Sequence, residues 1–365
     1  MAPFEEMEQT MRLSKIVIVF TLTLVAAAGL WAAEDTDKPN IVIFATGGTI
    51  AGSAESQTQA GYDSGQVGVE VLINAVPQLE EIADVTGEQI ANVGSQNMND
   101  EVWLKLAKRI NELAKSPDVD GMVITHGTDT MEETAYFLNL VVKTDKPVVL
   151  TGSMRPSTAL SADGPLNIFN AVAVAADPDA RGRGVLVVAN DSIHGGRAII
   201  KSNTTHVETF LSPKRGLIGL VQYGKTLYFR EPYAVHTTQS VFSVEGVDTL
   251  PRVDIIYIYE DVPGDLIEAA VKAGAKGIVT AGVGNGNMTD SALQALALAA
   301  TKGVVCVRSS RVPTGFVGRN VEVDDDEIGL VASYEHNPQK ARVLLRLALS
   351  KTTDPVKIQE YFAQY

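Results

Sequence analysis

The feature that most limits the fold of this chain is a regular alternation of short apolar runs with longer helical patterns. Beyond Asn40, the short runs include IVIFA, GMVIT, KPVVLTG and GVLVVAN, and the longer patterns include EVWLKLAKRINELAK and LNIFNAVAVAA. The short runs have the length of buried strands, and the longer ones have the length of helices. This alternation predicts an α/β fold with a mostly parallel sheet flanked by helices.

The chain is long enough for two domains with separate cores, since it has 365 residues of which 45% are hydrophobic. Clear periodicity is lost between about residues 230 and 252, and a second βαβαβ pattern follows. We therefore expect a larger catalytic α/β domain at residues 40–229, a linker at residues 230–252, and a smaller C-terminal α/β domain at residues 253–365.

The first 39 residues have the pattern of a secretory signal peptide with an N-terminal extension. Arg12 and Lys15 precede an apolar run that closes on small residues at Ala33 and then becomes acidic and polar. We expect cleavage near the end of this run and a periplasmic or secreted protein. An uncleaved anchor remains an alternative, because the run is close to the roughly 18 residues of a membrane helix. The acidic stretch before Met11 suits no targeting signal, so a start at Met11 is also open.

Charge and cysteine content exclude several classes of partner and bond. The formal net charge is -14, so the field of the whole molecule repels nucleic acid and anionic membrane surfaces. We expect no nucleic-acid partner and, after signal cleavage, no membrane partner. The single cysteine, Cys306, lies in the apolar run VVCVR, which favours a buried structural thiol and excludes an intramolecular disulfide.

Two glycine turns, ATGGTIAG at residues 45–52 and HGTDT at residues 126–130, each follow an apolar strand-like run. Thr130 with Glu133 matches a capping box, so a helix is expected to begin just after Asp129. Both turns then lie at the carboxyl ends of strands, where open α/β sheets bind ligands. Threonines on two such turns suggest nucleophilic attack on a carbonyl or amide, which requires a base to take the hydroxyl proton.

Seven segments of the sequence, which include both glycine turns, resemble those of a known family. They occur in the order ATGGTIAG, GSQNMND, ITHGTDTMEETAYFL, TGSMRPSTALSADGP, AGVGNGN, RSSRVPTG and NPQKARVLL. Together they resemble the bacterial type II L-asparaginases of the asparaginase and glutaminase amidohydrolase family, and the resemblance extends from Asn40 to Tyr365. It implies hydrolysis of L-asparagine to L-aspartate and ammonia, with weaker action on L-glutamine and without a cofactor or a metal.

The resemblance also implies catalytic roles. Thr49 resembles the primary nucleophile. Thr128 and Asp129 match the second catalytic threonine and the carboxylate that receives the α-amino group of the substrate, and Lys201 in IIKSNTT matches the lysine that works with Thr128. The protonation state of such a lysine depends on its burial and its neighbours, so the sequence leaves it open. Tyr62 lies in a segment of small, polar and glycine residues that suits a mobile lid.

Further matches concern the binding of the substrate. Ser95 and Gln96 match residues that grip the α-carboxylate and the α-amino group, which a hydroxyl and an amide can do. Asn287 and Glu322 match residues that complete the amino-group pocket. The resemblance implies a homotetramer whose sites combine the large domain of one subunit with the small domain of another. Asn97 departs from the aspartate that several relatives carry, and a cysteine pair found in some relatives is absent.

Two alternatives to an asparagine-selective hydrolase remain open. The first is a glutaminase-asparaginase of broader specificity; Gln96 favours asparagine, because relatives with strong glutaminase activity often have glutamate there. The second is a periplasmic amino-acid-binding protein, which would also be secreted and two-domain but gives no reason for two threonines and a lysine. We expect His126 to be a packing residue at a strand end, and no residues have metal-ligand spacing.

Overall fold

The computed structural model describes residues 38–52, 56 and 68–365. The predicted signal peptide and Tyr62 therefore lie outside the described residues. Within the described part of the chain, no helix has both the length and the apolar character that a membrane span requires.

The larger sheet contains eight strands in the order β10-β9-β6-β5-β4-β3-β1-β2. Their bounds are β1 Asn40–Gly47, β2 Asp84–Val93, β3 Gly121–Thr125, β4 Val148–Thr151, β5 Val185–Ala189, β6 Ser192–Gly195, β9 Gly219–Gln222 and β10 Lys225–Tyr228. Strands β2, β1, β3, β4 and β5 pair in parallel, whereas β6, β9 and β10 continue the sheet in antiparallel pairs. The mostly parallel sheet is confirmed, and its antiparallel edge makes it a mixed sheet.

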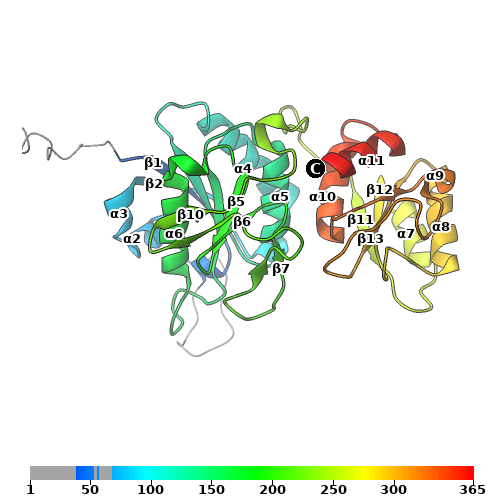
Figure 1. The fold of residues 1–365 in the computed structure, drawn as a ribbon, viewed down its shortest axis with the longest axis horizontal. Helices are drawn as coiled ribbons and strands as arrows, with labels where there is room; N and C mark the ends of the chain where they lie inside the picture. The colour runs from blue at the N-terminus through cyan, green and yellow to red at the C-terminus, as the bar shows by residue number, and fades with distance from the viewer. Residues whose placement is uncertain (1–37, 53–55, 57–67) are drawn as a thin grey trace, which may run out of the picture. The chain divides into compact units, whose positions relative to one another are not determined.

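Helices cover both faces of this sheet, as Figure 1 shows. Their bounds are α2 Val69–Asn74, α3 Leu79–Ile82, α4 Asp100–Leu113, α5 Met131–Val141 and α6 Gly164–Ala176. Successive side chains of a strand point to opposite faces. Val42 and Phe44 accordingly share a core with α4 and α5, whereas Ile41 and Ile43 share another with α2, α3 and α6. The central strands β1, β3, β4 and β5 are thus buried on both faces, which explains why they read as continuous apolar runs.

A smaller parallel sheet follows, with the order β11-β12-β13-β14. The strands are β11 Val253–Tyr257, β12 Gly277–Gly282, β13 Val305–Ser310 and β14 Val331–Ala332; the helices are α7 Asp265–Lys272, α8 Asp290–Thr301, α9 Asp325–Ile328, α10 Pro338–Leu349 and α11 Pro355–Gln364. Helices α7 and α8 line one core, and α10 and α11 line the other. The predicted α/β architecture, with a larger sheet domain followed by a smaller one, is confirmed.

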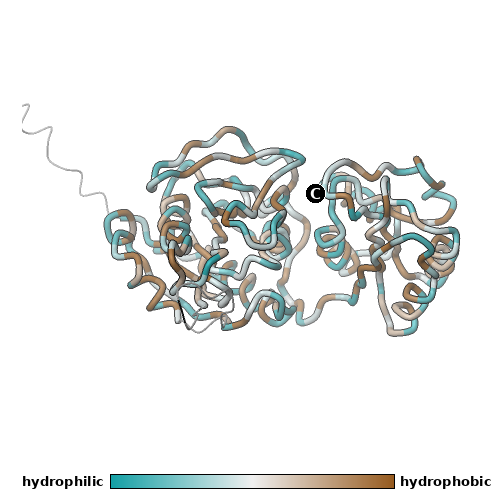
Figure 2. Tube along the Cα trace, turned by 90° about the horizontal axis from the view of Figure 1, so that it is seen from below, coloured by the Kyte–Doolittle hydropathy of each residue, from teal (hydrophilic) through white to brown (hydrophobic). Residues whose placement is uncertain are grey.

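The segment between the two sheets has one short 3-10 helix, Thr237–Gln239, and no α-helix or strand. Phe242 and Val244 in this segment are buried in the same core as α5 and α10. Figure 2 shows hydrophobic stretches, in brown, along the described part of the chain. The connection is therefore packed against the structure that it joins.

Cys306 is fully buried on β13, as expected. Burial raises the pKa of its thiol to about 12, so the thiolate that reacts with oxidants or substrates is scarce at neutral pH.

Candidate active site

The turns that carry the candidate residues lie at one edge of the larger sheet. Strands β1, β2 and β3 are parallel neighbours, so their carboxyl ends meet there. A 3-10 turn, Thr49–Ala51, follows β1, and a second, Ser95–Asn97, follows β2. The HGTDT turn follows β3 and leads into α5.

Glycines allow these turns to touch. A Cβ atom on Gly48 would lie 2.3 Å from the amide nitrogen of Gly127, and one on Gly127 would lie 2.5 Å from the hydroxyl oxygen of Ser95. No side chain could occupy either position without moving a neighbouring turn. Since Thr49 follows Gly48 and Thr128 follows Gly127, this close approach places the backbones of the two threonines next to each other.

Lys201 reaches this edge from β7, Ile200–Lys201, which pairs with β8, Phe210–Leu211, in a separate two-stranded sheet. Its ammonium donates to the hydroxyl oxygen of Thr128 at 2.9 Å and to a carboxylate oxygen of Asp129 at 2.6 Å. The Lys201 side chain is 16% exposed and that of Asp129 is 60% exposed. One cation thus holds a buried hydroxyl and an accessible carboxylate, an arrangement that suits proton transfer at the hydroxyl and binding of a substrate ammonium.

Ser95 ties the turn after β2 to the turn after β3. Its hydroxyl oxygen accepts a hydrogen bond from the Asp129 amide at 3.2 Å, and its carbonyl accepts one from the Thr130 hydroxyl at 2.8 Å. The predicted helix start is correct, because α5 begins at Met131 with Thr130 as its N-cap. The predicted capping bond is wrong: the Thr130 side chain makes no cap and bonds the neighbouring turn instead.

His126 supports the HGTDT turn from inside. Its Nδ1 lies 2.7 Å from the Gly127 carbonyl, which only accepts, so Nδ1 carries the proton. Nε2 then accepts from the Thr134 hydroxyl at 2.9 Å, and the Thr134 oxygen accepts from the Trp103 indole at 2.8 Å. Burial lowers the pKa of His126 to about 4, so the ring is neutral at pH 7. The expectation of a packing histidine is confirmed.

Comparison with known proteins identifies the family. Residues 40–234 match the family model described as Asparaginase, N-terminal, and residues 252–362 match the Glutaminase/Asparaginase C-terminal domain. The chain belongs to the asparaginase family. It is 54% identical over 355 residues to the probable periplasmic L-asparaginase of Haemophilus influenzae. That alignment covers 97% of this chain and 100% of the relative. It is 56% identical over 327 residues to L-asparaginase 2 of Escherichia coli, covering 90% of this chain and 93% of the relative.

A solved structure agrees with this assignment. The crystal structure of a probable cytoplasmic L-asparaginase from Campylobacter jejuni is 48% identical to this chain and superposes with a TM-score of 0.88. The match covers 90% of this chain and 100% of that one. This asparaginase-family chain is therefore an amidohydrolase with the fold of its relatives over nearly its whole length.

The remaining expected site residues are not joined to the lysine within one chain. Asn287 lies in a tight turn after β12 that is closed by backbone hydrogen bonds with Val283. Glu322 is exposed before α9. Among the described residues, neither side chain has a hydrogen bond or ion pair to Thr128, Asp129 or Lys201.

Gln96 is exposed and folds back over Gly94, where a Cβ atom would lie 2.5 Å from its amide oxygen. Gly94 therefore makes room for the Gln96 side chain beside Ser95. The neighbouring Asn97, the departure noted in the sequence, is also exposed.

One residue at this edge was missed by sequence reasoning. Glu132, in the first turn of α5, is only 4% exposed, and its carboxylate accepts the backbone amide of Lys201. The available signal was its position directly after the HGTDT turn, in a helix that is mostly apolar, because a charge buried there needs partners.

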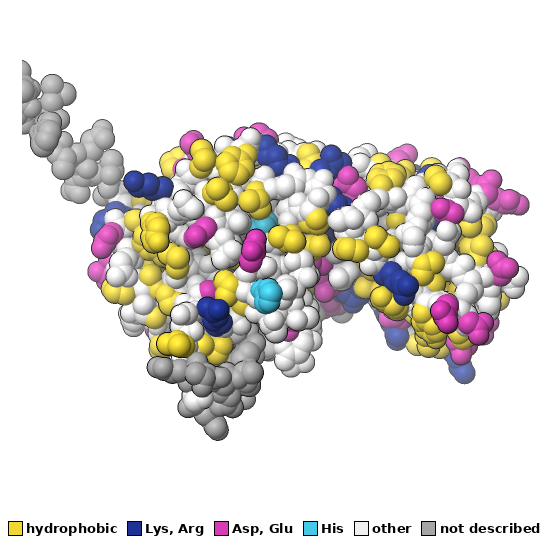
Figure 3. Space-filling view, turned by 60° about the horizontal axis from the view of Figure 1, so that its bottom comes forward, with side chains coloured by type: hydrophobic (Ala, Val, Ile, Leu, Met, Phe, Trp, Pro, Cys, Tyr) yellow, Lys and Arg dark blue, Asp and Glu magenta, His cyan; other side chains and the backbone are white. Residues whose placement is uncertain are grey.

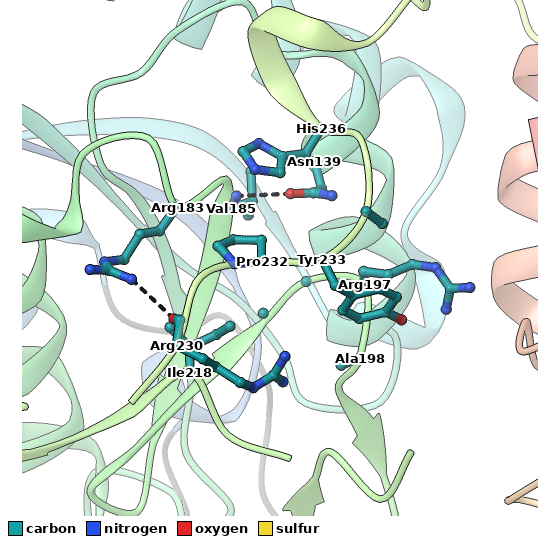
Figure 4. Close-up of a pocket in the computed structure, with 13 residues that line it drawn as sticks. Asn139, Arg183, Val185, Arg197, Ala198, Ile218, Arg230, Pro232, Tyr233 and His236 are labelled. Carbon is teal, nitrogen blue, oxygen red and sulfur yellow. Dashed lines mark hydrogen bonds between the residues drawn. The ribbon is translucent and has the colours of Figure 1, made fainter. Parts of the chain in front are cut away.

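A small pocket near β5 and β6, shown in Figure 4, is a poor candidate for a second site despite its three arginines. Arg183 donates to the carbonyl of Arg230, Arg230 donates to the carbonyls of Gly216 and Leu217, and Arg197 donates to Tyr365. The cavity holds about 20 Å³, enough for one water molecule. These guanidinium groups join loops.

Charged side chains do not form a large single-sign field on the face shown in Figure 3, where basic groups lie apart from one another. Together with the net charge of -14, this distribution offers no basic track for a polyanion on that face.

Proposed function

We propose that this chain hydrolyses L-asparagine to L-aspartate and ammonia, with Thr49 as the nucleophile. The observation that carries the proposal is the ammonium of Lys201 bonded to Thr128 and Asp129, on a turn in backbone contact with the turn of Thr49. The test is release of ammonia when the purified chain is incubated with asparagine. Binding of asparagine without release of ammonia would contradict hydrolysis and would favour the alternative of a periplasmic amino-acid-binding protein.

In this proposal the hydroxyl of Thr49 attacks the side-chain amide carbon of the substrate. Backbone amides of the glycine turns stabilise the negative charge that develops on the amide oxygen. The carbon–nitrogen bond breaks, and ammonia leaves with a proton that the Thr128–Lys201 pair is positioned to supply; the proton lost by the attacking Thr49 hydroxyl replaces it. A water molecule then attacks the ester carbon joined to Thr49, which releases L-aspartate and returns a proton to the Thr49 oxygen. No metal or cofactor is required for any of these steps.

The α-amino and α-carboxylate groups of the substrate are assigned to Asp129, Ser95 and Gln96. The exposed carboxylate of Asp129 keeps one oxygen for Lys201, so its other oxygen can accept from a substrate ammonium. Glutamine shares both charged ends with asparagine, and the C-terminal family model carries both enzyme names. Gln96 favours asparagine, so kcat/KM should be higher for asparagine than for glutamine in parallel assays. Equal values would indicate the broader glutaminase-asparaginase.

We also propose that the site is completed by a second copy of the chain. Within the described part of one chain, neither Asn287 nor Glu322 has a hydrogen bond or ion pair to the cluster formed by Thr128, Asp129 and Lys201. Both nevertheless match substrate-binding residues of the family. A homotetramer in which the small domain of one subunit reaches the large domain of another accounts for both facts. Activity should fall on dilution together with tetramer dissociation, followed by light scattering and assay on the same samples. A fully active monomer at nanomolar concentration would refute the shared site.

For localisation, we propose export to the periplasm or beyond, directed by residues 1–39. The similar protein of Haemophilus influenzae is named periplasmic, whereas the Campylobacter jejuni structure is named cytoplasmic, so the family name alone does not decide the compartment. The native mature chain should begin between about Val25 and Glu34, where the apolar run closes on small residues. N-terminal sequencing measures this, and a cytosolic chain that retains Met1 would contradict export.

A further inference from the structure

Glu132 binds two segments that lie far apart in the sequence. One carboxylate oxygen accepts the Lys201 amide at 2.8 Å, and the other accepts the side-chain amide of Asn337 at 2.9 Å. The positions of Glu132 and Asn337 differ by 205 residues. Since the carboxylate is almost fully buried, both bonds are needed to offset its loss of hydration.

The Lys201 bond acts on the backbone of the residue whose side chain holds Thr128 and Asp129. Strand β7 has only two residues, and its partner strand β8 is equally short. The Lys201 amide donates to Glu132, outside this small ladder. A two-stranded pair of this length has little stability of its own, so the carboxylate is a main restraint on where the Lys201 side chain begins.

Asn337 has a fixed orientation. As the N-cap of α10, it accepts the Lys340 amide through its side-chain oxygen at 3.1 Å, which leaves its NH₂ group for Glu132. Lys340 is itself buried, and its ammonium donates to the carbonyl of Ile199, two residues before Lys201. Helix α10 of the C-terminal domain therefore holds the approach to Lys201 at two neighbouring points.

We propose that Glu132 and Asn337 are positioning residues that form a clamp, through which helix α10 sets the position of Lys201 at Thr128 and Asp129. The inference rests on the proposed function in that Lys201 works with Thr128 during turnover. It adds that the C-terminal domain of the same chain determines the geometry of the catalytic lysine. A shift of about 1 Å at such a group can lower turnover by about 10²-fold.

Reversing the direction of the Glu132–Asn337 bond tests the clamp. Glu132→Gln provides one acceptor and one donor where both partners are donors, so one bond is lost in either orientation. Asn337→Asp places two carboxylates against each other. In the double variant, the amide introduced on α5 can donate to the carboxylate introduced at the start of α10 and still accept the Lys201 amide. The second oxygen of that new carboxylate retains the cap of α10, and the double variant has the same net charge as the native pair.

Each single variant should lower kcat by about 10-fold to 100-fold, with KM changed by less than about threefold because neither residue is among those assigned to the substrate. The double variant should recover kcat to within about threefold of the native chain. Glu133→Gln is the matched control: it makes the same substitution at the next position of α5, and Glu133 has no hydrogen bond to Lys201. Its kcat should stay within about twofold of native.

Hydrogen exchange provides a readout that does not depend on activity. In Glu132→Ala, which removes both acceptors, the Lys201 amide should exchange at least about tenfold faster than in the native chain, whereas the double variant, which keeps an acceptor for this amide, should retain protection. If the native chain releases no ammonia from asparagine, the proposed function fails, and the exchange rates still decide whether the clamp exists.

Several results would overturn the clamp in an active native enzyme. One is a native kcat in both single variants; another is a double variant no better than its weaker parent, which would indicate only general damage to the fold. Unchanged exchange of the Lys201 amide in Glu132→Ala would overturn it as well. If Glu132→Gln does not fold, the kcat of Asn337→Asp can still be compared with that of the double variant. These two variants differ only at position 132, where the introduced amide restores the bond in the reversed direction.

Discussion

Replacing Thr49 with valine should lower kcat for asparagine by roughly 10³-fold or more, about 4 kcal/mol of transition-state stabilisation. Valine keeps the branched shape of threonine and removes the hydroxyl that we propose attacks the amide carbon. Thr49 is buried at the turn after β1, so the change leaves the packing of the turn nearly as it is.

Binding of the product should separate chemistry from recognition in this variant. The α-amino and α-carboxylate groups of aspartate are assigned to residues other than Thr49, so its dissociation constant should stay within about tenfold, or 1.4 kcal/mol. Turnover and aspartate binding are measured on one preparation. If turnover persists within about tenfold of native in a folded protein, Thr49 is not the nucleophile, and Thr128 becomes the candidate.

Thr125→Val is a matched control for this experiment. Thr125 ends β3, three residues before Thr128, and its hydroxyl is buried without a hydrogen-bond partner among the described residues. Removing an unpaired buried hydroxyl costs little and can stabilise a protein. The variant should therefore retain kcat within about threefold of native. A loss as large as that of Thr49→Val would mean that any change of threonine to valine near this edge impairs turnover.

Gly48→Ala should lower kcat by at least about 10²-fold, because it separates the two threonine turns. Gly48 has φ 83° and ψ -171°, a conformation that is nearly exclusive to glycine. The new Cβ atom would lie 2.3 Å from the amide nitrogen of Gly127, and backbone atoms cannot move aside as a flexible side chain can. We expect a loss of about 2–5 kcal/mol in the free energy of unfolding, from backbone strain and overpacking together.

Gly182→Ala separates these two contributions. Gly182 also has a positive φ, 73°, but a Cβ atom there would meet nothing within 4 Å. This variant should lose about 1–2 kcal/mol of stability from backbone strain and keep its turnover. Urea denaturation and ammonia release are measured for both variants. Native turnover in Gly48→Ala would show that close contact between the two turns is not needed for catalysis.

Local patterns in the sequence were enough to predict much of the fold. The alternation of strand and helix lengths predicted the α/β class, and burial of β1 on both faces is the reason that its apolar run has no polar positions. The antiparallel edge formed by β6, β9 and β10 was not predicted. Strands of four residues give too short a pattern to state which neighbour they pair with or in which direction.

The sequence by itself determined the two glycine turns, the threonines that they present and, through the family resemblance, the roles expected of them. Only the tertiary structure decided how these residues meet. The Thr130 hydroxyl donates to the carbonyl of Ser95 and does not form the expected cap, and Lys201 donates to Thr128, which lies 73 positions away in the chain. Glu132 joined the lysine to Asn337, 205 positions away. Hydrogen bonds within a helix or turn involve neighbours in the sequence and therefore leave a local pattern. These bonds depend instead on which distant segments pack together. Until the fold brings them into contact, their donors and acceptors cannot be told from ordinary polar residues.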